Sequence, residues 1–220
     1  MQRRTSSEDV FDKLHADIVS LKLTPGTRLS EVDVARQFDV SRQPVREAFI
    51  RLHDIELLRV QPQRATEVRR LSEQALRNAR FIRTAVEIEV IRVACQRDTA
   101  RYAQAFEKNL EDQAEAIERK RISHFHRLDY AFHRMICVAA KHEFAYETVA
   151  SNKSQLDRMC LLSLTDTDEM KQIHDDHTAL YNHIGAGREE HAIALVRRHL
   201  SRVIDLLDAV RSKHPSFFTD

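Results

Sequence analysis

The sequence predicts a mostly α-helical protein, and two observations support this prediction. Only 3 Gly and 4 Pro occur among the 220 residues, whereas ordinary usage would give roughly 15 Gly and about 11 Pro. Folds built on glycine-rich phosphate-binding loops, or on many short strands joined by glycine turns, are therefore excluded. Apolar residues recur at helical spacing along most of the chain, which leaves helices joined by short connections.

The first helix is expected between Val10 and Leu23. Val10, Leu14 and Ile18 recur at intervals of four residues, as on one face of a helix. The segment Thr24-Pro25-Gly26 contains three residues that continue a helix poorly, so we expect the helix to end before it.

Two short helices are expected next, each opened by a serine. Ser30, with Asp33 three residues later, has the pattern of an N-cap, and Asp39-Val40 is expected to form the turn after this helix. Ser41 is a second N-cap, followed by Pro44 in the first turn, where proline is tolerated. The expected buried face of this helix consists of Val45, Ala48, Phe49 and Leu52.

The pattern then changes to two short strands and afterwards returns to helix. Leu57–Val60 and Thr66–Val68 flank a polar tip, which predicts a β-wing. From Ser72 onward we expect six or seven helices. Their joints are predicted near residues 96–99, 118–123, 141–144, 165–168 and 185–188.

The charge balance excludes a chain that is attracted to nucleic acid or membrane over its whole surface. The 35 Lys and Arg nearly balance the 34 Asp and Glu, for a net charge of +1, so any binding to nucleic acid must be local. Residues 1–70 carry 13 basic and 11 acidic residues, and residues 71–220 carry 22 and 23. Between Ser41 and Leu52 the bias is sharper, because three arginines accompany one glutamate.

The cysteines and the lengths of the apolar stretches indicate in which cellular compartment the protein is expected. The 3 cysteines include no C-x-x-C pair, which argues against a disulfide framework and against a thiolate zinc site. The first residues lack the apolar region of a signal peptide, and the longest wholly apolar stretch, Met135–Ala140, is too short to span a bilayer. We therefore expect a cytoplasmic protein that does not enter a membrane.

The two short helices predict a DNA-binding unit. A tight turn followed by a helix that opens with Ser41-Arg42-Gln43 is the arrangement in which a recognition helix enters the major groove. Arg42 and Arg46 project from one face, and an arginine can bond both O6 and N7 of guanine. The alternative is a solvated arginine face on a small helical unit. The predicted DNA contacts are Arg42, Gln43 and Arg46, together with Arg28, Ser41 and Arg64, of which Arg28, Ser41 and Arg64 are better placed for phosphates.

The histidines predict a metal site. Ten of the 12 lie between His124 and His214. Asp129 and His133 are four residues apart on one expected helix and can hold one ion together, while His177 and His199 lie beside the apolar stripes of two later helices. One Asp and three His suit Zn, Ni, Mn, Fe or Co, and an octahedral ion would keep two positions for water or for a small organic acid. The alternative is that each histidine is separately a surface or core residue. His126, His174, His183 and His191 are then outer partners of the ligands or unrelated to them.

The N-terminal motifs resemble the winged helix-turn-helix of the GntR family of bacterial transcription regulators. The resemblance covers roughly residues 8–70 and rests on Pro25–Glu31, Val34-Ala35 and Val40–Ala48, in which Pro-Val-Arg-Glu-Ala is similar to the FadR-type branch. It implies a homodimer whose recognition helices read an inverted repeat in double-stranded DNA. Glu56 and Ala65 stand where the family usually has glycine.

Residues 72–210 resemble the FCD effector-binding domain of the same branch, an antiparallel helical bundle. In its metal-binding members the ligands fall on an Asp-x3-His helix, an acidic-x-His segment and a His-Leu pair. The matching residues here are Asp129, His133, His177 and His199. Arg83 and Glu87 resemble an Arg-x3-Glu pair of the first helix, whose cation can bind an effector carboxylate; a surface ion pair is the alternative. His183 departs from the small residue of the family.

The predicted protein is a winged helix-turn-helix over residues 1–70 followed by an all-α antiparallel bundle over residues 71–220, with a hinge at residues 69–75. We expect a homodimeric, sequence-specific transcription regulator, most often a repressor in this family, and not an enzyme. Its effector is expected to be a small carboxylate bound at a divalent metal, Zn, Ni or Mn, and at Arg83. Two alternatives stay open: a metal-dependent hydrolase, and a metal-free regulator with a larger hydrophobic effector.

Overall fold

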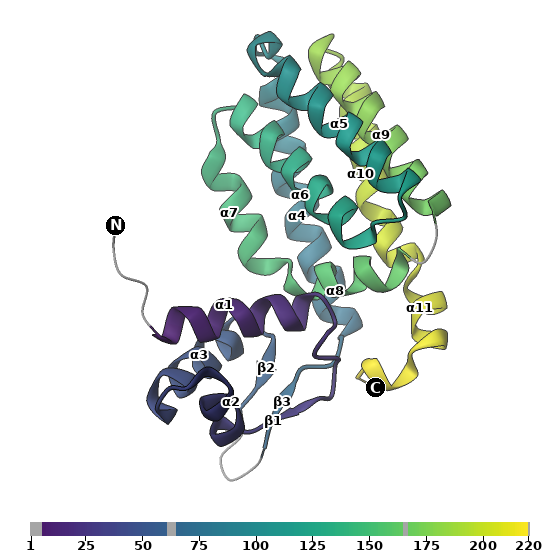
Figure 1. The fold of residues 1–220 in the computed structure, drawn as a ribbon. Helices are drawn as coiled ribbons and strands as arrows, with labels where there is room; N and C mark the ends of the chain where they lie inside the picture. The colour runs from purple at the N-terminus through teal and green to yellow at the C-terminus, as the bar shows by residue number, and fades with distance from the viewer. Residues whose placement is uncertain (1–5, 61–64, 165–166, 220) are drawn as a thin grey trace.

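The structure, a computed structural model, describes residues 6–60, 65–164 and 167–219. A small N-terminal unit lies against one end of a longer helical bundle (Figure 1). The N-terminal unit contains α1 (Ser6–Val19), β1 (Arg28–Leu29), α2 (Glu31–Phe38), α3 (Arg42–Asp54), β2 (Leu58–Arg59) and β3 (Thr66–Val68). Its three strands form an antiparallel sheet in the order β1-β3-β2.

The turn between α2 and α3 follows the expected chemistry. The hydroxyl of Ser30 accepts a hydrogen bond from the backbone N–H of Asp33, which caps α2. Asp39 ends α2 with φ of 53°, in the left-handed region that short polar residues tolerate. Ser41 occupies the N-cap position of α3, but its side chain makes no capping hydrogen bond. The two short helices and their turn are therefore confirmed.

Two features of this unit differ from the expectation. The first helix ends at Val19 and not near Leu23, because Leu21 adopts φ of 62° and takes the backbone out of the helix. The pairing of Arg28 with Glu67 adds β1 to the predicted two-stranded wing. Such a two-residue strand has no sequence pattern of its own, since only its long-range partner defines it.

Glu56 occupies the turn between α3 and β2 with φ of 62°. A glycine adopts this left-handed conformation without strain, which explains why a glycine is usual at such a turn. The side chain of Glu56 accepts a hydrogen bond from Nη1 of Arg69 at 3.2 Å, so the charged residue also ties the turn to the strand end.

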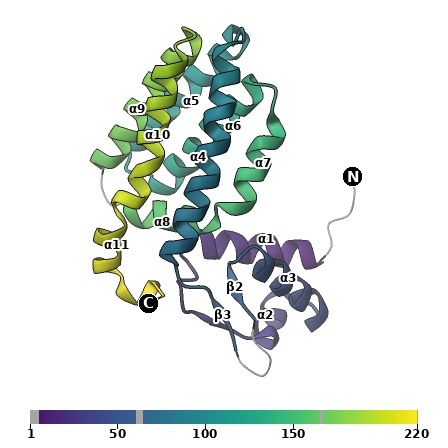
Figure 2. The ribbon, with the colours of Figure 1, turned by 180° about the vertical axis from the view of Figure 1, so that it is seen from behind.

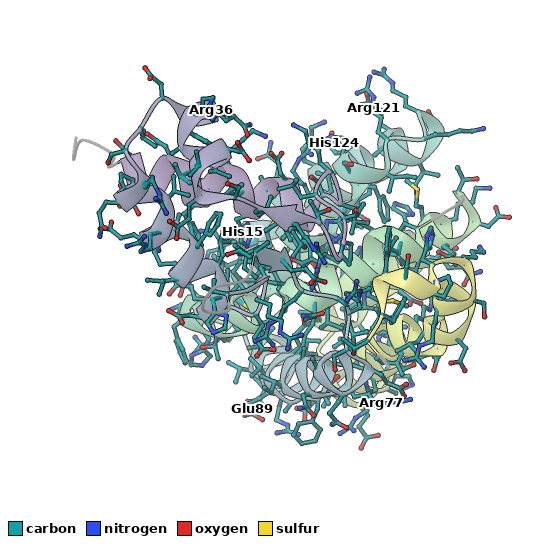
Figure 3. The ribbon with its side chains drawn as sticks, turned by 90° about the horizontal axis from the view of Figure 1, so that it is seen from below. His15, Arg36, Arg77, Glu89, Arg121 and His124 are labelled. Atoms are coloured by element: carbon teal, nitrogen blue, oxygen red, sulfur yellow. The ribbon has the colours of Figure 1, made fainter. Side chains whose placement is uncertain are left out.

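The helical bundle begins after Ser72, whose hydroxyl caps α4 by accepting from the N–H of Ala75. Within the described residues it has seven helices of ten or more residues, in agreement with the expected six or seven, and a short α11 that continues α10 after Leu206. Figures 1 and 2 show α4 between α10 and α7 on the face opposite α5. The helices are α4 (Glu73–Cys95), α5 (Ala103–Glu118), α6 (Ile122–Ala139), α7 (Glu143–Asn152), α8 (Ser154–Ser163), α9 (Thr167–Gly185), α10 (Glu189–Asp205) and α11 (Leu207–Lys213).

The bundle core is apolar at one end and polar near its middle. Phe106 and Phe132 pack edge to face with ring centroids 5.5 Å apart, within a cluster that includes Ile91, Leu180 and Val196. Ionisable side chains are buried beside this cluster, and buried polar groups are costly unless they are paired. Within the described residues, no helix is long and apolar enough to cross a membrane.

The joint between the two units is bonded on both sides. Arg158 of α8 is fully buried, and its Nη1 donates to the backbone carbonyl of Arg69 at 2.6 Å. Leu71 is also fully buried and pairs with the C-terminal segment, because its N–H donates to Phe217 at 2.8 Å and its carbonyl accepts from Thr219 at 2.9 Å. The predicted hinge at residues 69–75 therefore lies in a segment whose backbone is held by the bundle.

Replacement of Arg158 tests how much this joint depends on one buried guanidinium. We expect Arg158→Ala to lower the free energy of unfolding by about 2–4 kcal/mol, because it leaves a cavity and an unpaired carbonyl at Arg69. Arg70→Ala is the matched control: Arg70 also donates to a backbone carbonyl at the joint, that of Ser216, but its side chain is 43% exposed. The control should lose less than about 1 kcal/mol. Urea unfolding measures both, and equal losses would contradict the account.

Candidate metal and effector site and candidate DNA-binding face

Four ionisable side chains converge inside the bundle from three helices. Asp129 and His133 come from α6, His177 from α9 and His199 from α10. One potential ligand atom from each of them lies within 4.8 Å of the others. The three imidazoles are buried, with His177 fully so, and Asp129 is half-buried. The four residues that the sequence predicts as metal ligands are thus brought together, and this cluster can bind a metal ion.

Each imidazole of the cluster is held from behind by an oxygen atom. A histidine that binds a metal usually presents one nitrogen to the ion and gives the other to an acceptor, which fixes the ring. The contacts from Nδ1 are His133 to Oε2 of Glu87 at 2.7 Å, His177 to Oε1 of Gln113 at 2.9 Å, and His199 to Oδ2 of Asp176 at 3.2 Å. The opposite nitrogens, Nε2, are therefore free to face a common ion.

The Nε2 nitrogens, which face the middle of the cluster, are suited to a metal ion because they lack hydrogen-bond partners. Nε2 of His133 and of His177 are buried and make no hydrogen bond. Their contacts with Oδ1 of Asp129, at 3.9 and 3.3 Å, join the carboxylate to both rings. Buried polar atoms without partners are uncommon in proteins, and an ion at this position would satisfy both nitrogens and the carboxylate together.

The pKa shifts favour the protonation states that a metal needs. Burial lowers the pKa of His177 and of His199, so both imidazoles are neutral and keep a lone pair. Burial alone would raise the pKa of Asp129, but its contact with His177 and the charges of His133 and Arg83 hold that pKa well below its usual value. The cluster therefore offers the carboxylate of Asp129 and the neutral imidazoles of His177 and His199.

Arg83 and Glu87 form a buried ion pair between the cluster and the cavity. Nε of Arg83 donates to Oε1 of Glu87 at 2.6 Å, and the other carboxylate oxygen faces His133. Burial alone would raise the pKa of Glu87, but the charges of Arg83 and His133 outweigh it and lower that pKa. The expected alternative, an ion pair between these two residues, exists, but it is buried and not on the surface.

Two of the outer partners were not identified from the sequence. Gln113 lies on α5 and donates through its amide to Asn109 at 2.7 Å, and Asn109 in turn donates to the carbonyl of Leu128 at 3.1 Å. Asp176 precedes His177, accepts a hydrogen bond from Nη2 of Arg198 at 3.3 Å and forms an ion pair with Nη2 of Arg202 at 3.0 Å. The available signal was the polar pair Asn109 and Gln113 on the otherwise apolar buried face of α5.

A cavity of about 320 Å³ opens beside the metal-ligand cluster. Asp129, His199 and Arg83 lie on its wall together with Arg80 and Arg202. Much of the remaining wall is apolar and includes Phe125, Leu156, Leu164, Leu200, Val203 and Leu206. The cavity wall therefore combines charged side chains, which also include Glu169 and Asp205, with apolar ones.

The remaining predicted histidines take separate places. His126 is buried, lines the cavity and packs edge to face against Tyr130, with ring centroids 4.6 Å apart. Nε2 of His174 lies 3.2 Å from the carbonyl of Leu110. His183 and His191 lie near each other, with centroids 5.4 Å apart. These histidines lie outside the metal-ligand cluster.

The two arginines predicted to read DNA share one carboxylate. Nη2 of Arg42 donates to Oε2 of Glu31 at 2.8 Å, and Nε and Nη2 of Arg46 donate to the two oxygens of Glu31 at 3.3 and 3.2 Å. Both side chains remain more than half exposed. The hydrogen bonds from Arg46 and Arg42 lower the pKa of Glu31. Glu31 therefore bridges the two guanidinium groups next to the start of α3.

Three further predicted DNA contacts, Ser41, Gln43 and Arg28, are exposed on the N-terminal unit. Ser41 and Gln43 are exposed at the start of α3, and the amide of Gln43 donates to Glu47 at 3.1 Å. Arg28 is exposed on β1. Arg64 lies outside the described residues. By contrast, Arg51 of the same basic helix lies over the ring of Phe11 at 4.0 Å from its centroid, which gives it a packing role.

Comparison with protein families accounts for both units. Residues 6–68 match the family of bacterial regulatory proteins called gntR, and residues 79–202 match the FCD domain. The chain is 31% identical over 214 residues to the HTH-type transcriptional repressor RspR of Escherichia coli (strain K12), which covers 97% of this chain and 94% of that protein. It is 27% identical to the gluconate operon transcriptional repressor of Bacillus subtilis (strain 168), across 82% of this chain and 73% of that protein.

Two solved structures share the fold. The structure of E. coli McbR/YncC superposes with a TM-score of 0.79 at 20% identity and covers 94% of this chain and 99% of its own. A putative GntR transcriptional regulator from Rhodococcus sp. RHA1 gives a TM-score of 0.78 at 22% identity, covering 92% of this chain and 98% of its own. The fold of this chain, a small N-terminal unit followed by a helical bundle, is therefore shared by proteins whose sequences are only 20–22% identical to it.

Replacement of Gln113 tests whether the metal-ligand cluster is held from behind. We expect Gln113→Leu to weaken binding of a divalent metal about 10- to 100-fold, since the ring of His177 loses the acceptor that orients it. Gln104→Leu is the matched control, because Gln104 is an exposed glutamine on the same helix. Titration calorimetry on the metal-free proteins measures both affinities. Equal affinities for the two variants would show that Gln113 has no such role.

Proposed function

The chain belongs to the gntR family of bacterial regulatory proteins and carries an FCD domain, and we propose that it is a repressor controlled by a small carboxylate bound beside a divalent metal in the bundle. As a member of this family it is a DNA-binding transcription regulator and not an enzyme. We place the DNA-binding unit at residues 1–70 and the effector unit at residues 71–220. A regulator of chromosomal DNA works in the cytoplasm.

The observation that carries the metal proposal is the set of inward-facing nitrogens of the cluster. Nε2 of His133 and of His177 are buried and make no hydrogen bond, while Nδ1 of His177 meets Gln113 and Nδ1 of His133 lies 2.7 Å from a carboxylate oxygen of Glu87. Three imidazoles and one carboxylate suit Zn, Ni or Mn among the divalent ions. Bound there, such an ion would supply a Lewis-acidic position that accepts a carboxylate oxygen.

The cavity supports a carboxylate with an apolar or hydroxylated body as effector. Asp129 and His199 border the cavity, so an acid group can approach the cluster from it, and Arg83 can offer a charge-assisted hydrogen bond. The apolar part of the wall, which includes Leu156 and Leu200, would contact the rest of the molecule. The name of the gluconate operon repressor, a relative of this chain, points to the same chemical class.

Helix α8 supports a route from the effector cavity to the DNA-binding unit. Leu156 and Cys160 of α8 line the cavity. On the same helix, Gln155 donates to the carbonyl of Glu56 at 3.3 Å, and Arg158 donates to the carbonyl of Arg69. An effector that binds more tightly to one position of α8 would therefore shift the position of the DNA-binding unit. The free energy by which it changes DNA affinity can be no larger than the difference between its binding free energies for the two positions of α8.

Helix α3 is proposed to enter the major groove. Its start is exposed and carries Arg42 and Arg46, bridged by Glu31 at the first position of α2. We propose that two copies of the chain, related by a two-fold axis, place their α3 helices in successive major grooves of an inverted repeat. Arg28 and Ser41 would contact phosphates, which position the protein without reading sequence.

One alternative keeps the regulator and removes the metal. The apolar part of the cavity wall, which includes Phe125, Val203 and Leu206, also suits a larger hydrophobic effector. In that case the metal-ligand cluster would be a hydrogen-bonded polar core. The two proposals differ in whether the response to the effector needs the metal ligands.

Removal of the metal ligands is the first test. We expect the purified protein to contain about one divalent metal per chain by elemental analysis, and Asp129→Ala and His177→Ala to contain none, because each removes one of four ligands. In a thermal-shift screen of sugar acids, hydroxy acids and dicarboxylates, the acid that binds should raise the melting temperature of the metal-loaded protein. It should leave the melting temperatures of both variants unchanged.

His174→Ala is the control for these variants, since His174 lies on the same helix as His177 but outside the cluster. It should keep both the metal and the ligand response. A metal-free wild-type protein, with Asp129→Ala and His177→Ala retaining the full ligand response, would reject the metal and support the hydrophobic-effector alternative.

Loss of Arg46 tests the DNA-reading face. We expect Arg46→Ala to lose most of the preference for the operator over unrelated DNA, a cost of about 1–3 kcal/mol for each half-site. Arg36→Ala is the control, because Arg36 is an exposed, ion-paired arginine of α2 with its side chain 75% exposed. Fluorescence anisotropy at fixed salt concentration compares the affinities. Normal selectivity in an Arg42→Ala/Arg46→Ala double variant would reject α3 as the recognition helix.

A further inference from the structure

Three arginines line the effector cavity, and two of them are paired with a carboxylate of the protein. Arg83 is paired with Glu87 at 2.6 Å, and Nη2 of Arg202 is paired with Asp176 at 3.0 Å. Arg80 is the third arginine of the wall. Its Nε is shielded from water and makes no hydrogen bond with a described residue, and the same holds for Nη1 of Arg202. The cavity wall therefore carries N–H donors that lack acceptors.

Arg80 and Arg202 lie on the same side of the metal-ligand cluster. Helices α4 and α10 lie side by side (Figure 2) and are antiparallel, because an ion pair joins the last turn of α4 to the first residue of α10. Arg80 precedes Arg83 by three residues on α4, and Arg202 follows His199 by three residues on α10. In antiparallel helices both steps go in the same direction, here toward the start of α4 and the DNA-binding unit, by about 4.5 Å along the axis.

A carboxylate is the acceptor that a guanidinium binds best. Two parallel N–H groups of the planar fork bond its two oxygens, and such charge-assisted hydrogen bonds are about twice as strong as neutral ones. The wall around Arg80 and Arg202 also contains Val203 and Leu206. Donors that are left unpaired among apolar side chains are costly, and an acid group of the effector would satisfy them.

Two acidic side chains, Glu169 and Asp205, also border the cavity. Asp205 accepts a hydrogen bond from the hydroxyl of Ser201 at 3.1 Å. Neither carboxylate bonds Nε of Arg80, which makes no hydrogen bond. An ammonium group attracted by these carboxylates is the rival occupant of this end of the cavity, and it differs from an acid group in the sign of its charge.

We propose that Arg80, together with Nη1 of Arg202, binds a second acid group of the effector, so that the effector is a short dicarboxylate. This inference rests on the proposed function, in which the first carboxylate binds at the metal and at Arg83. The second carboxylate lies at Arg80, about one helical turn nearer to the DNA-binding unit. Arg80 is then the residue that distinguishes a diacid from the monoacid of equal length.

Pairs of acids of equal length test the proposal by titration calorimetry on the metal-loaded protein. Succinate, glutarate and adipate are each compared with the monoacid in which a methyl group replaces the second carboxylate: butanoate, pentanoate and hexanoate. We expect the diacid of the right length to bind about 10- to 100-fold more tightly than its monoacid, the value of a hydrogen bond between charged groups. The amino acid in which an ammonium group replaces the second carboxylate should bind more weakly than the diacid.

Replacement of Arg80 should remove this preference and nothing else. Arg80→Leu should bind the diacid and the monoacid equally and keep the wild-type affinity for the monoacid, while Arg80→Lys keeps the positive charge and should restore part of the preference. Arg77→Leu is the matched control, because Arg77 also lies on α4, is paired with Glu73 at 2.7 Å and does not border the cavity. It should keep the full preference. An unchanged metal content and melting temperature would verify that the variants are folded.

The possible failures are distinguishable. If the wild-type protein binds monoacids at the metal but prefers no diacid, or if Arg80→Leu keeps the diacid preference, the role of Arg80 is overturned while the proposed function stands. Tighter binding of the amino acid than of the diacid would overturn that role in favour of Glu169 and Asp205. If no acid binds the metal-loaded protein, both the role of Arg80 and the carboxylate effector of the proposed function are overturned.

Discussion

The bundle is organised around the contacts of Asp129 with the imidazoles of His133 and His177. A carboxylate and imidazoles in a helical core are tolerated only when each polar atom has a partner. The outer nitrogens meet Glu87, Gln113 and Asp176, so residues of α4, α5 and α9 are committed to supporting the cluster. The inner nitrogens of His133 and His177 have no such partner. A cation between these two inner nitrogens and the carboxylate of Asp129 would give each of them a partner, which is the physical reason for proposing a metal there.

The same arrangement connects chemistry inside the bundle with the position of the DNA-binding unit. The cavity beside Asp129 and His199 is closed in part by α8, and α8 also holds the joint through Arg158 and the carbonyl of Arg69. The C-terminal segment binds the joint again at Leu71. Because the joint is bonded and not loose, a change in the bundle can be transmitted to α3 through packed elements. A freely moving linker would instead decouple the two units.

Local signals in the sequence predicted the N-terminal unit well. Ser30, Asp39 and the apolar stripe of α3 specify the helices and their turn through contacts within a few residues. The four residues of the metal-ligand cluster were also found, since Asp129 and His133 share one helix face, His177 and His199 lie beside the apolar stripes of two later helices, and the family resemblance pointed to the same four. The sequence did not identify Gln113, Asp176 and Glu31 as hydrogen-bond partners of the site residues, because each of them contacts a residue of another helix. Strand β1 was missed for the same reason, as only its pairing with β3 defines it.

The central claim is that a carboxylate changes DNA affinity through a metal held by the cluster. The most direct measurement is the affinity of the protein for its operator duplex, titrated with a carboxylate identified by thermal shift, in metal-loaded protein and in the same protein stripped by a chelator. The account predicts that the carboxylate changes the affinity of the metal-loaded protein about 5- to 150-fold and leaves the stripped protein unchanged. An equal change in both preparations would contradict it.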